Sequence, residues 1–309
     1  MSVKFALYPV GYQGIWYDSK VIVPWRKLIP IVKDMGWDGI TVSGKRPYAS
    51  VLDLTERHCK AMKELCDSVG LELVAWDAYS NFMDADQEHR EANLVWTKEV
   101  IKCANTMGIP LVKIFAGWKG IVLRDGHGQY EWDQMKTPYA PPLEIWNRVK
   151  EGIAEACKMA DEYGVTLVLQ NHPPPFEYGY EDCLAMIEEI NHPRLKMCFD
   201  IPNFGYTTYD RQLRQTEEYI VRAVSACRKY IAYSHISGSF EKDPKSKYVQ
   251  VGDWPFNYPV LIRELKKIGY NGYLAYENCG PNIIAHSLAG IEEVHRRAKN
   301  ALAYLKQLL

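Results

Sequence analysis

The 309-residue chain lacks the features that mark membrane-spanning and nucleic-acid-binding proteins. No run of about 18 apolar residues occurs, so no transmembrane helix is predicted. The apolar run at the N-terminus is too short for a signal peptide. The formal net charge is -1, and acidic and basic residues are mixed along the chain, so no stripe of positive charge would bind nucleic-acid phosphates or an anionic membrane. We therefore expect a cytoplasmic protein whose ligand is a small molecule.

The chain also lacks paired cysteines and interdomain linkers. None of its eight cysteines forms a Cys-x-x-Cys pair, which argues against the common zinc and redox motifs. Most lie in apolar segments, as Cys198 does in LKMCFD, so free buried thiols are expected. No long Pro/Gly/Ser-rich stretch divides the sequence, and 47% of the residues are hydrophobic. We expect a single domain over residues 1–309.

Short apolar runs alternate with segments of helical period along the whole chain. Eight strands are predicted, at residues 5–10, 39–43, 71–78, 111–116, 166–172, 195–200, 231–237 and 273–278. Helical segments such as PWRKLIPIVKDMG, TERHCKAMKELCDSVG and NYPVLIRELKKIG follow strands and close with a glycine. Eight such units predict an α/β fold, a (β/α)8 TIM barrel. An open doubly wound sheet is the alternative, but YPVGYQG after the first strand is not its Gly-rich fingerprint.

Asp200, His235 and Glu277 each end one of three successive predicted strands. In a closed parallel barrel those strand ends are neighbours on one rim, where active sites lie, so the three side chains can converge. Carboxylate and imidazole ligands suit a divalent ion such as manganese, magnesium or cobalt. The alternative is structural, with a turn cap, a core histidine and a surface ion pair. Three such residues in register favour the metal site.

Other residues at predicted strand ends are expected to contact substrate: Asp77, Trp118, Asn203 and Ser237. Between the fourth and fifth strands, residues 117–142 form a long excursion in which IVLR and QYEW flank DGHG and predict a hairpin. The excursion could form a lid over the barrel mouth or a contact between subunits, and the sequence does not choose between them. Aromatic residues are frequent in the predicted loops, and aromatic faces stack on sugar rings or flat aglycones.

The stretch YVQVGDWPFNYPVLIRELKKIGYNGYLAYE, together with YSHISG, LKMCFDIPNF and LVLQNH, resembles the sugar phosphate isomerase/epimerase family, the xylose isomerase-like TIM barrels. The resemblance extends from the fifth strand to the end of the chain. It implies a divalent metal, with manganese expected ahead of magnesium or cobalt. The implied metal ligands are Asp200, His235, Glu277 and the residue at Gln170.

The sequence departs from this family's pattern at several positions. The family has glutamate at Gln170, often histidine at Asn203, and often lysine and aspartate where this chain has Ser237 and Gly238. An amide oxygen can bind a hard divalent ion but cannot act as a base. His172, on the same strand face if the two-residue period continues, is the natural replacement base. Alternatively, Gln170 is a hydrogen-bonding spacer and His172 caps the proline turn.

Three functions are consistent with these residues. The first is a metal-dependent enzyme in which His172 or Glu277 removes the proton next to the carbonyl of a keto-sugar or sugar derivative, giving isomerisation, epimerisation or elimination. The second is suggested by a resemblance to the larger subunit of the C-glycoside deglycosidases, which split an oxidised (3-keto) glycoside from an aromatic aglycone with a smaller partner chain. The third is a non-catalytic sugar-binding barrel. We also expect an oligomer.

Overall fold

The computed structural model describes residues 3–13, 21–46, 48–118, 120, 122–124, 127–129, 142–176, 179–201, 213–237, 256–278, 283–284 and 287–309. Eight parallel strands close into a barrel in the order β1, β10, β9, β8, β7, β4, β3, β2. They are β1 (Lys4–Tyr8), β2 (Gly39–Ser43), β3 (Glu72–Asp77), β4 (Leu111–Ile114), β7 (Thr166–Gln170), β8 (Leu195–Asp200), β9 (Ile231–Ile236) and β10 (Tyr273–Glu277). The predicted (β/α)8 barrel is therefore confirmed.

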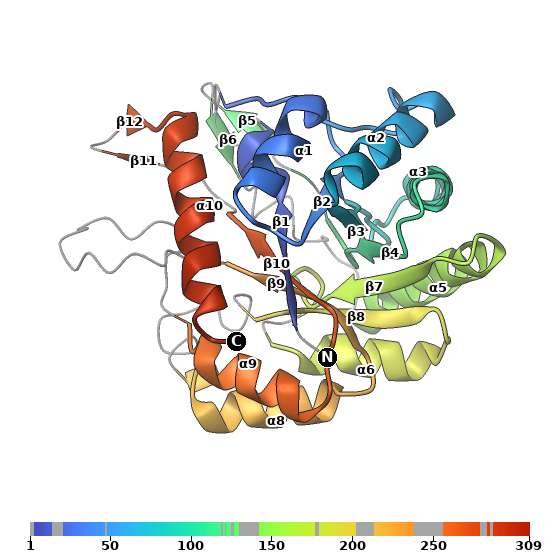
Figure 1. Ribbon diagram of the computed structural model, residues 1–309. Helices are drawn as coiled ribbons and strands as arrows, with labels where there is room; N and C mark the ends of the chain where they lie inside the picture. The colour runs from blue at the N-terminus through green and yellow to red at the C-terminus, as the bar shows by residue number, and fades with distance from the viewer. Residues whose placement is uncertain are drawn as a thin grey trace.

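Eight helices surround the barrel in the part of the chain described above (Figure 1). They are α1 (Trp25–Asp34), α2 (Glu56–Val69), α3 (Gln87–Thr106), α5 (Pro142–Glu162), α6 (Glu181–Ile190), α8 (Glu217–Cys227), α9 (Tyr258–Lys267) and α10 (Ile291–Lys306). The glycines expected to close the three quoted helical segments, Gly36, Gly70 and Gly269, all have positive φ, from 67° to 90°. This left-handed conformation is open to glycine without strain, so each helix stops there.

Several strands end earlier than the sequence predicts. β1 stops at Tyr8 because Pro9 begins a 3-10 turn, η1 (Pro9–Tyr12). β7 stops at Gln170 because the backbone N–H of His172 donates to the carbonyl of Gln170 and turns the chain. The two-residue alternation therefore ends at Gln170, and the strand geometry expected for His172 is wrong.

The buried residues form two main layers, as in other barrels of this type. The larger cluster lies between strands and helices and includes Phe5, Ile40 and Leu169. A smaller cluster, which we call the inner core, consists of Ala6, Tyr8, Val10, Val74, Ala75, Val168, Cys198, Tyr233 and Ala275. Because side chains alternate along a strand, the inner core and residues two positions further on share the face that lines the barrel.

Smaller features also bear on the predictions. A two-stranded hairpin, β5 (Val122–Arg124) and β6 (His127–Gln129), is paired antiparallel between the fourth and fifth barrel strands as expected, but the predicted bounds were wrong, because His127 and Gly128 of the expected DGHG turn belong to the second strand. A second short pair is β11 (Ile283–Ile284) and β12 (Ser287–Leu288). All seven cysteines in the described ranges are free thiols, as expected. Among those ranges, none of the helices is both long enough and apolar enough to cross a membrane.

Candidate functional site

Four strand ends on one side of the barrel carry the residues predicted to bind a metal. Gln170, Asp200, His235 and Glu277 end or nearly end β7, β8, β9 and β10, which are consecutive in the barrel. Each lies two residues after a member of the inner core, so all four side chains face the inside of the barrel. The fold therefore places the predicted residues on one continuous arc of the rim.

The acidic and imidazole groups of this arc are close enough to share one ion. Asp200, His235 and Glu277 each offer a ligand atom, and these atoms lie within 4.8 Å of one another. Glu277 Oε2 is 3.1 Å from His235 Nδ1. Asp200 and His235 are almost fully buried, whereas the Glu277 side chain is 17% exposed. Divalent cations bind such atoms at about 2.0–2.6 Å, which this spacing accommodates.

Gln170 completes the arc. Its Nε2 donates to Asp200 Oδ2 at 2.5 Å and lies 3.4 Å from His235 Nδ1. Its carbonyl Oε1 is buried and has no hydrogen-bond partner among the residues that the structure describes. An orphaned buried acceptor is costly, and a bound cation would satisfy it. The neighbouring Asn171 is structural, because its amide exchanges two hydrogen bonds with the backbone of Asp200.

Burial and neighbouring charges shift the protonation of these groups in different directions. Burial raises the pKa of Asp200 to about 6. Burial would also raise the pKa of Glu277, but His235, Lys113 and His172 together outweigh it and the net shift is downward. Burial alone would lower the pKa of His235, yet Cys198, Glu277 and Asp77 together hold it well above its usual value. Glu277 is therefore a carboxylate at neutral pH.

Two further buried charged residues lie close to the predicted metal ligands. They come from other strands than β7–β10. Asp77, at the end of β3, has its Oδ1 3.1 Å from His235 Nε2. Lys113, on β4, is 1% exposed, and burial lowers its pKa while Asp77 and Glu277 act to raise it. In formal charge these two residues cancel each other. Once His235 gives up its proton to bind a metal, Asp200 and Glu277 leave two uncompensated negative charges, which one divalent cation would balance.

Aromatic rings line the neighbouring part of the site, and we call Tyr79, Phe115 and Trp118 the aromatic wall. Phe115 and Trp118 stack with ring centroids 4.9 Å apart, and Tyr79 lies about 6 Å from both. Lys113 Nζ is 3.5 Å from the centroid of Phe115. The wall follows β3 and β4, so it stands at the same end of the barrel as the arc of Gln170, Asp200, His235 and Glu277, which we call the metal arc.

His172 packs against this wall. Its ring meets Phe115 and Trp118 edge-on, with centroids 5.0 and 5.6 Å away. Nδ1 contacts the backbone carbonyl of Pro173, so Nδ1 carries the proton and Nε2 is left as an acceptor. Burial lowers the pKa of His172 to about 4, although the contact with Pro173 and the charge of Glu277 act to raise it. His172 is therefore a neutral imidazole close to the metal arc.

The four residues predicted to contact substrate differ in their position and burial. Trp118 belongs to the aromatic wall and is 8% exposed. The backbone of Ser237 is held by Tyr258, whose hydroxyl donates to the Ser237 carbonyl and accepts from its N–H at 3.0 Å. Asp77 is fully buried and hydrogen-bonded to His235. Asn203 lies outside the described residues, as do Gly238 and most of the excursion at 117–142.

Four further residues lie near the site: Tyr8, Ser43, Tyr79 and Lys113. The hydroxyl of Tyr79 bonds to Ser43 at 2.8 Å and to Tyr8, whose ring lies 5.3 Å from that of His235. The sequence signal for Lys113 is a single lysine inside the apolar run LVKIFA. A charged residue in a buried strand requires a partner, so the lysine in this run predicts a buried ion pair or a polar ligand.

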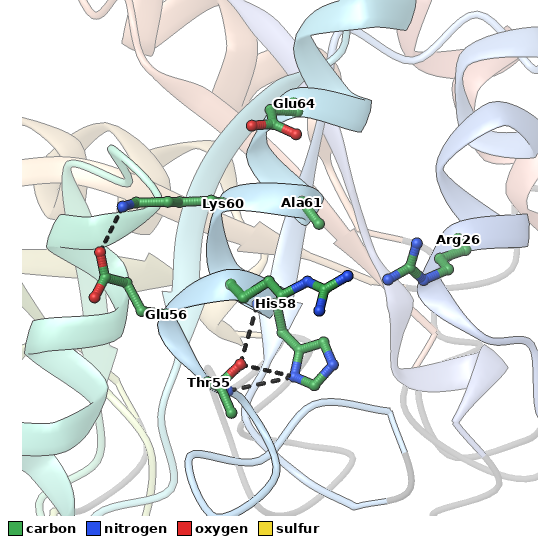
Figure 2. A pocket seen from close by; sticks show the side chains of 8 residues that line it. Arg26, Thr55, Glu56, His58, Lys60, Ala61 and Glu64 are labelled. Atoms are coloured by element: carbon green, nitrogen blue, oxygen red, sulfur yellow. Dashed lines mark hydrogen bonds and ion pairs between the residues drawn. The ribbon is translucent and has the colours of Figure 1, made fainter.

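A separate groove lies between Arg26, at the start of α1, and the N-terminal half of α2 as far as Glu64 (Figure 2). Its volume is about 1110 Å³, and its lining mixes both signs of charge. Lys60 pairs with Glu56 at 2.5 Å, and Thr55 caps α2 through His58. These groups satisfy one another, which is the pattern of an ordinary helix start rather than of a ligand site.

Comparisons with known proteins agree with this architecture. The model of the xylose isomerase-like TIM barrel family matches residues 29–308. Fructoselysine 3-epimerase of Shigella flexneri is 26% identical over 177 residues, which cover 54% of this chain and 58% of that protein. The chain thus spans less than two thirds of that relative's length.

Two solved structures have the same fold over nearly the whole chain. D-psicose 3-epimerase of Clostridium cellulolyticum H10, crystallised with D-tagatose, has a TM-score of 0.73 at 16% identity and covers 99% of each chain. The 3-keto-D-glucoside 4-epimerase of Escherichia coli has a TM-score of 0.70 at 16% identity, covering 99% of this chain and 100% of that one. At such low identity these structures compare the fold alone. With the family model matched over most of its length, the chain belongs to the xylose isomerase-like TIM barrel family.

Proposed function

We propose that the chain is a divalent-metal-dependent enzyme that removes the proton next to the carbonyl of a keto-sugar or sugar derivative. The observation that carries the proposal is the convergence of Asp200, His235 and Glu277 within 4.8 Å, with the orphaned Oε1 of Gln170 beside them. The named relatives support it, since they are epimerases of sugars or sugar derivatives. We expect the other proposed ligand, Gln170, to bind through its amide oxygen.

The residues present fit a divalent ion, with manganese expected before magnesium or cobalt. Oxygen and imidazole donors, two ionised carboxylates and a net deficit of positive charge are the features such ions require. When bound, the ion would polarise the substrate carbonyl and stabilise negative charge that develops on its oxygen. The chain's own residues then have to move the proton.

Glu277 is the stronger candidate for the base. It is ionised at neutral pH because His235 keeps its pKa low, and it is the most exposed residue of the metal-binding trio. His172 offers a lone pair at Nε2, but with a pKa of about 4 it is a weak base at neutral pH. We propose that Glu277 removes the proton and that His172 hydrogen-bonds or relays a proton at a substrate hydroxyl.

The aromatic wall is the proposed sugar-binding surface. A sugar ring has an apolar face of C–H groups that stacks on aromatic rings, and Trp118 supplies the largest such face here. Lys113, next to Phe115, would hydrogen-bond a hydroxyl or the developing anion. Asn203 and Ser237 stay predicted substrate contacts.

One observation favours a narrower function. With Gln170 in place of glutamate, Glu277 is the one carboxylate of the arc with an exposed side chain, at 17%, whereas Asp200 is 2% exposed and accepts from Gln170. An elimination needs one base, whereas an epimerisation needs a proton returned from the other face. We therefore keep cleavage of an oxidised C-glycoside, with a smaller partner subunit, as the second candidate. A non-catalytic sugar-binding barrel is the alternative to both.

The test combines metal content with proton exchange. Purified chain is analysed for bound metal by mass spectrometry, and D-psicose and a 3-keto-glucoside are incubated with it in deuterium oxide. We expect close to one divalent ion per chain and incorporation of deuterium, abolished in Glu277→Gln and kept in Glu72→Gln, a surface control paired with Lys4. No bound metal and no exchange with either sugar would leave only the sugar-binding barrel.

A further inference from the structure

His235 is held between two carboxylates on opposite edges of its ring. Asp77 Oδ1 lies 3.1 Å from Nε2, and Glu277 Oε2 lies 3.1 Å from Nδ1. Asp77 and His235 are 0% and 1% exposed. Neither contact is a surface ion pair that solvent would weaken.

The two ring nitrogens face different surroundings. Nδ1 points to the proposed metal ligands, since Gln170 Nε2 is 3.4 Å and Glu277 Oε2 is 3.1 Å away. Nε2 points to Asp77, across the barrel. An imidazole binds a metal through one unprotonated nitrogen, and a hydrogen bond from the other nitrogen decides which one is free.

We propose that Asp77 is a positioning residue that keeps the proton of His235 on Nε2 and so leaves Nδ1 as the metal ligand. This inference rests on the proposed metal site. It replaces the expectation that Asp77 contacts substrate, because a fully buried carboxylate whose oxygen already accepts from Nε2 does not reach a sugar in the barrel mouth.

The position of Asp77 in the barrel makes the contact rigid. In the closed strand order, β3 and β9 are four places apart in either direction, so Asp77 reaches His235 across the barrel from the opposite wall. The ring is also held laterally, with Tyr8 and Tyr233 at centroid distances of 5.3 and 5.0 Å. A ring packed in this way cannot rotate to exchange its nitrogens without disturbing the inner core.

Lys113 accounts for the negative charge of Asp77. The second oxygen, Oδ2, is buried and has no hydrogen-bond partner among the described residues. Lys113 is paired with Asp77 in the register of the neighbouring strands β3 and β4, and Asp77 is the strongest of the charges that act to raise its pKa. The buried carboxylate is thus compensated by a cation without giving up Oδ1, which stays available to His235.

The tautomer can be read in the wild-type chain. Chain labelled with 15N-histidine is studied by NMR with one equivalent of Zn²⁺, a diamagnetic probe, and the His235 signals are assigned from their loss in His235→Asn. We expect a proton on Nε2 and none on Nδ1. A proton on Nδ1 in the Zn²⁺-bound chain would overturn the inference.

The second measurement is the dissociation constant for Mn²⁺ and Zn²⁺ by calorimetry. We expect Asp77→Asn to weaken both about 10- to 100-fold, the usual effect of removing such a supporting carboxylate. The matched control is Ser80→Ala, a buried residue three positions on whose hydroxyl bonds to the backbone of Phe115 and to no proposed ligand. Affinity within twofold of wild type in Asp77→Asn, with the control unchanged, would refute the role.

The outcomes separate this inference from the proposed function. If the wild-type chain binds neither ion, both the proposed function and this inference are refuted. If the wild-type chain binds metal through Nε2 of His235, or if Asp77→Asn binds metal equally well, only the inference is refuted. If Asp77→Asn does not fold, the wild-type NMR measurement decides.

Discussion

Replacing Gln170 with glutamate tests the metal arc most directly. In the metal-free chain the new carboxylate would face Asp200 Oδ2, which the amide now reaches at 2.5 Å. Two buried carboxylates at this distance cannot both be ionised at modest cost. We therefore expect Gln170→Glu to destabilise the metal-free chain and to strengthen metal binding.

The structure sets the size of the effect. The two carboxylates avoid most of their repulsion when one of them takes up a proton. Asp200 does so readily, because its pKa is already about 6. Protonating it at pH 7 costs about 1.4 kcal/mol, since one pKa unit corresponds to about 1.4 kcal/mol. For a chain of this length the loss corresponds to about 2 °C in melting temperature. Metal binding releases that proton and gains a charged ligand, so affinity for Mn²⁺ should rise about tenfold or more.

The assay is thermal unfolding by circular dichroism, with EDTA and with excess Mn²⁺, beside calorimetric titration with Mn²⁺. Gln307→Glu is the matched control, because it adds the same charge at an exposed helix end. We expect Gln170→Glu to melt lower than wild type in EDTA and to gain more than wild type from Mn²⁺.

Two results would refute the reasoning. A metal-free Gln170→Glu that is as stable as the control would mean that Gln170 does not face Asp200. Unchanged Mn²⁺ affinity in a folded variant would mean that position 170 is not a ligand, and the site would then reduce to Asp200, His235 and Glu277.

Three further predictions follow from other parts of the structure. Glu277→Gln should lower the rate of substrate deuterium exchange about 10²- to 10⁴-fold with metal still bound, and a loss below tenfold would exclude Glu277 as the base. Trp118→Ala should raise KM about tenfold with little change in kcat, as loss of one aromatic contact predicts, and the opposite pattern would remove it from the sugar site. Glu293, buried and paired with Arg296 and Arg297 at 2.7 and 2.8 Å, has a lowered pKa despite burial. Its contribution is present above about pH 4.5 and lost as the pH falls through its folded pKa, so Glu293→Gln should cost about 2 kcal/mol in urea unfolding at pH 7 and progressively less as the pH falls below 4.5.

The metal arc could be predicted from the sequence because it depends on strand order alone. Once eight strands are recognised, the residues at their carboxyl ends lie on one rim, and Asp200, His235 and Glu277 follow from the alternation of inward side chains. The strand ends were less predictable. At His172 the backbone bonds to Gln170 and leaves the sheet, an event that apolar periodicity does not record.

Contacts across the barrel could not be predicted from spacing. The pairing of Asp77 with His235 joins residues 158 positions apart on opposite walls, and it depends on how the barrel closes. Lys113 was visible as a charge in an apolar strand, but its partners come from other strands. Such pairings require the three-dimensional arrangement of the strands as well as their order.

The site is divided between the two halves of the chain. Gln170, Asp200, His235 and Glu277 all come from β7–β10, whereas the aromatic wall and Lys113 come from β3 and β4. If the proposed function holds, substrate preference would depend on the first half of the sequence and metal binding on the second half. Asp77 is the exception, because it belongs to the first half but contacts His235 in the second half. A substitution at Asp77 would therefore affect the proposed metal ligand as well.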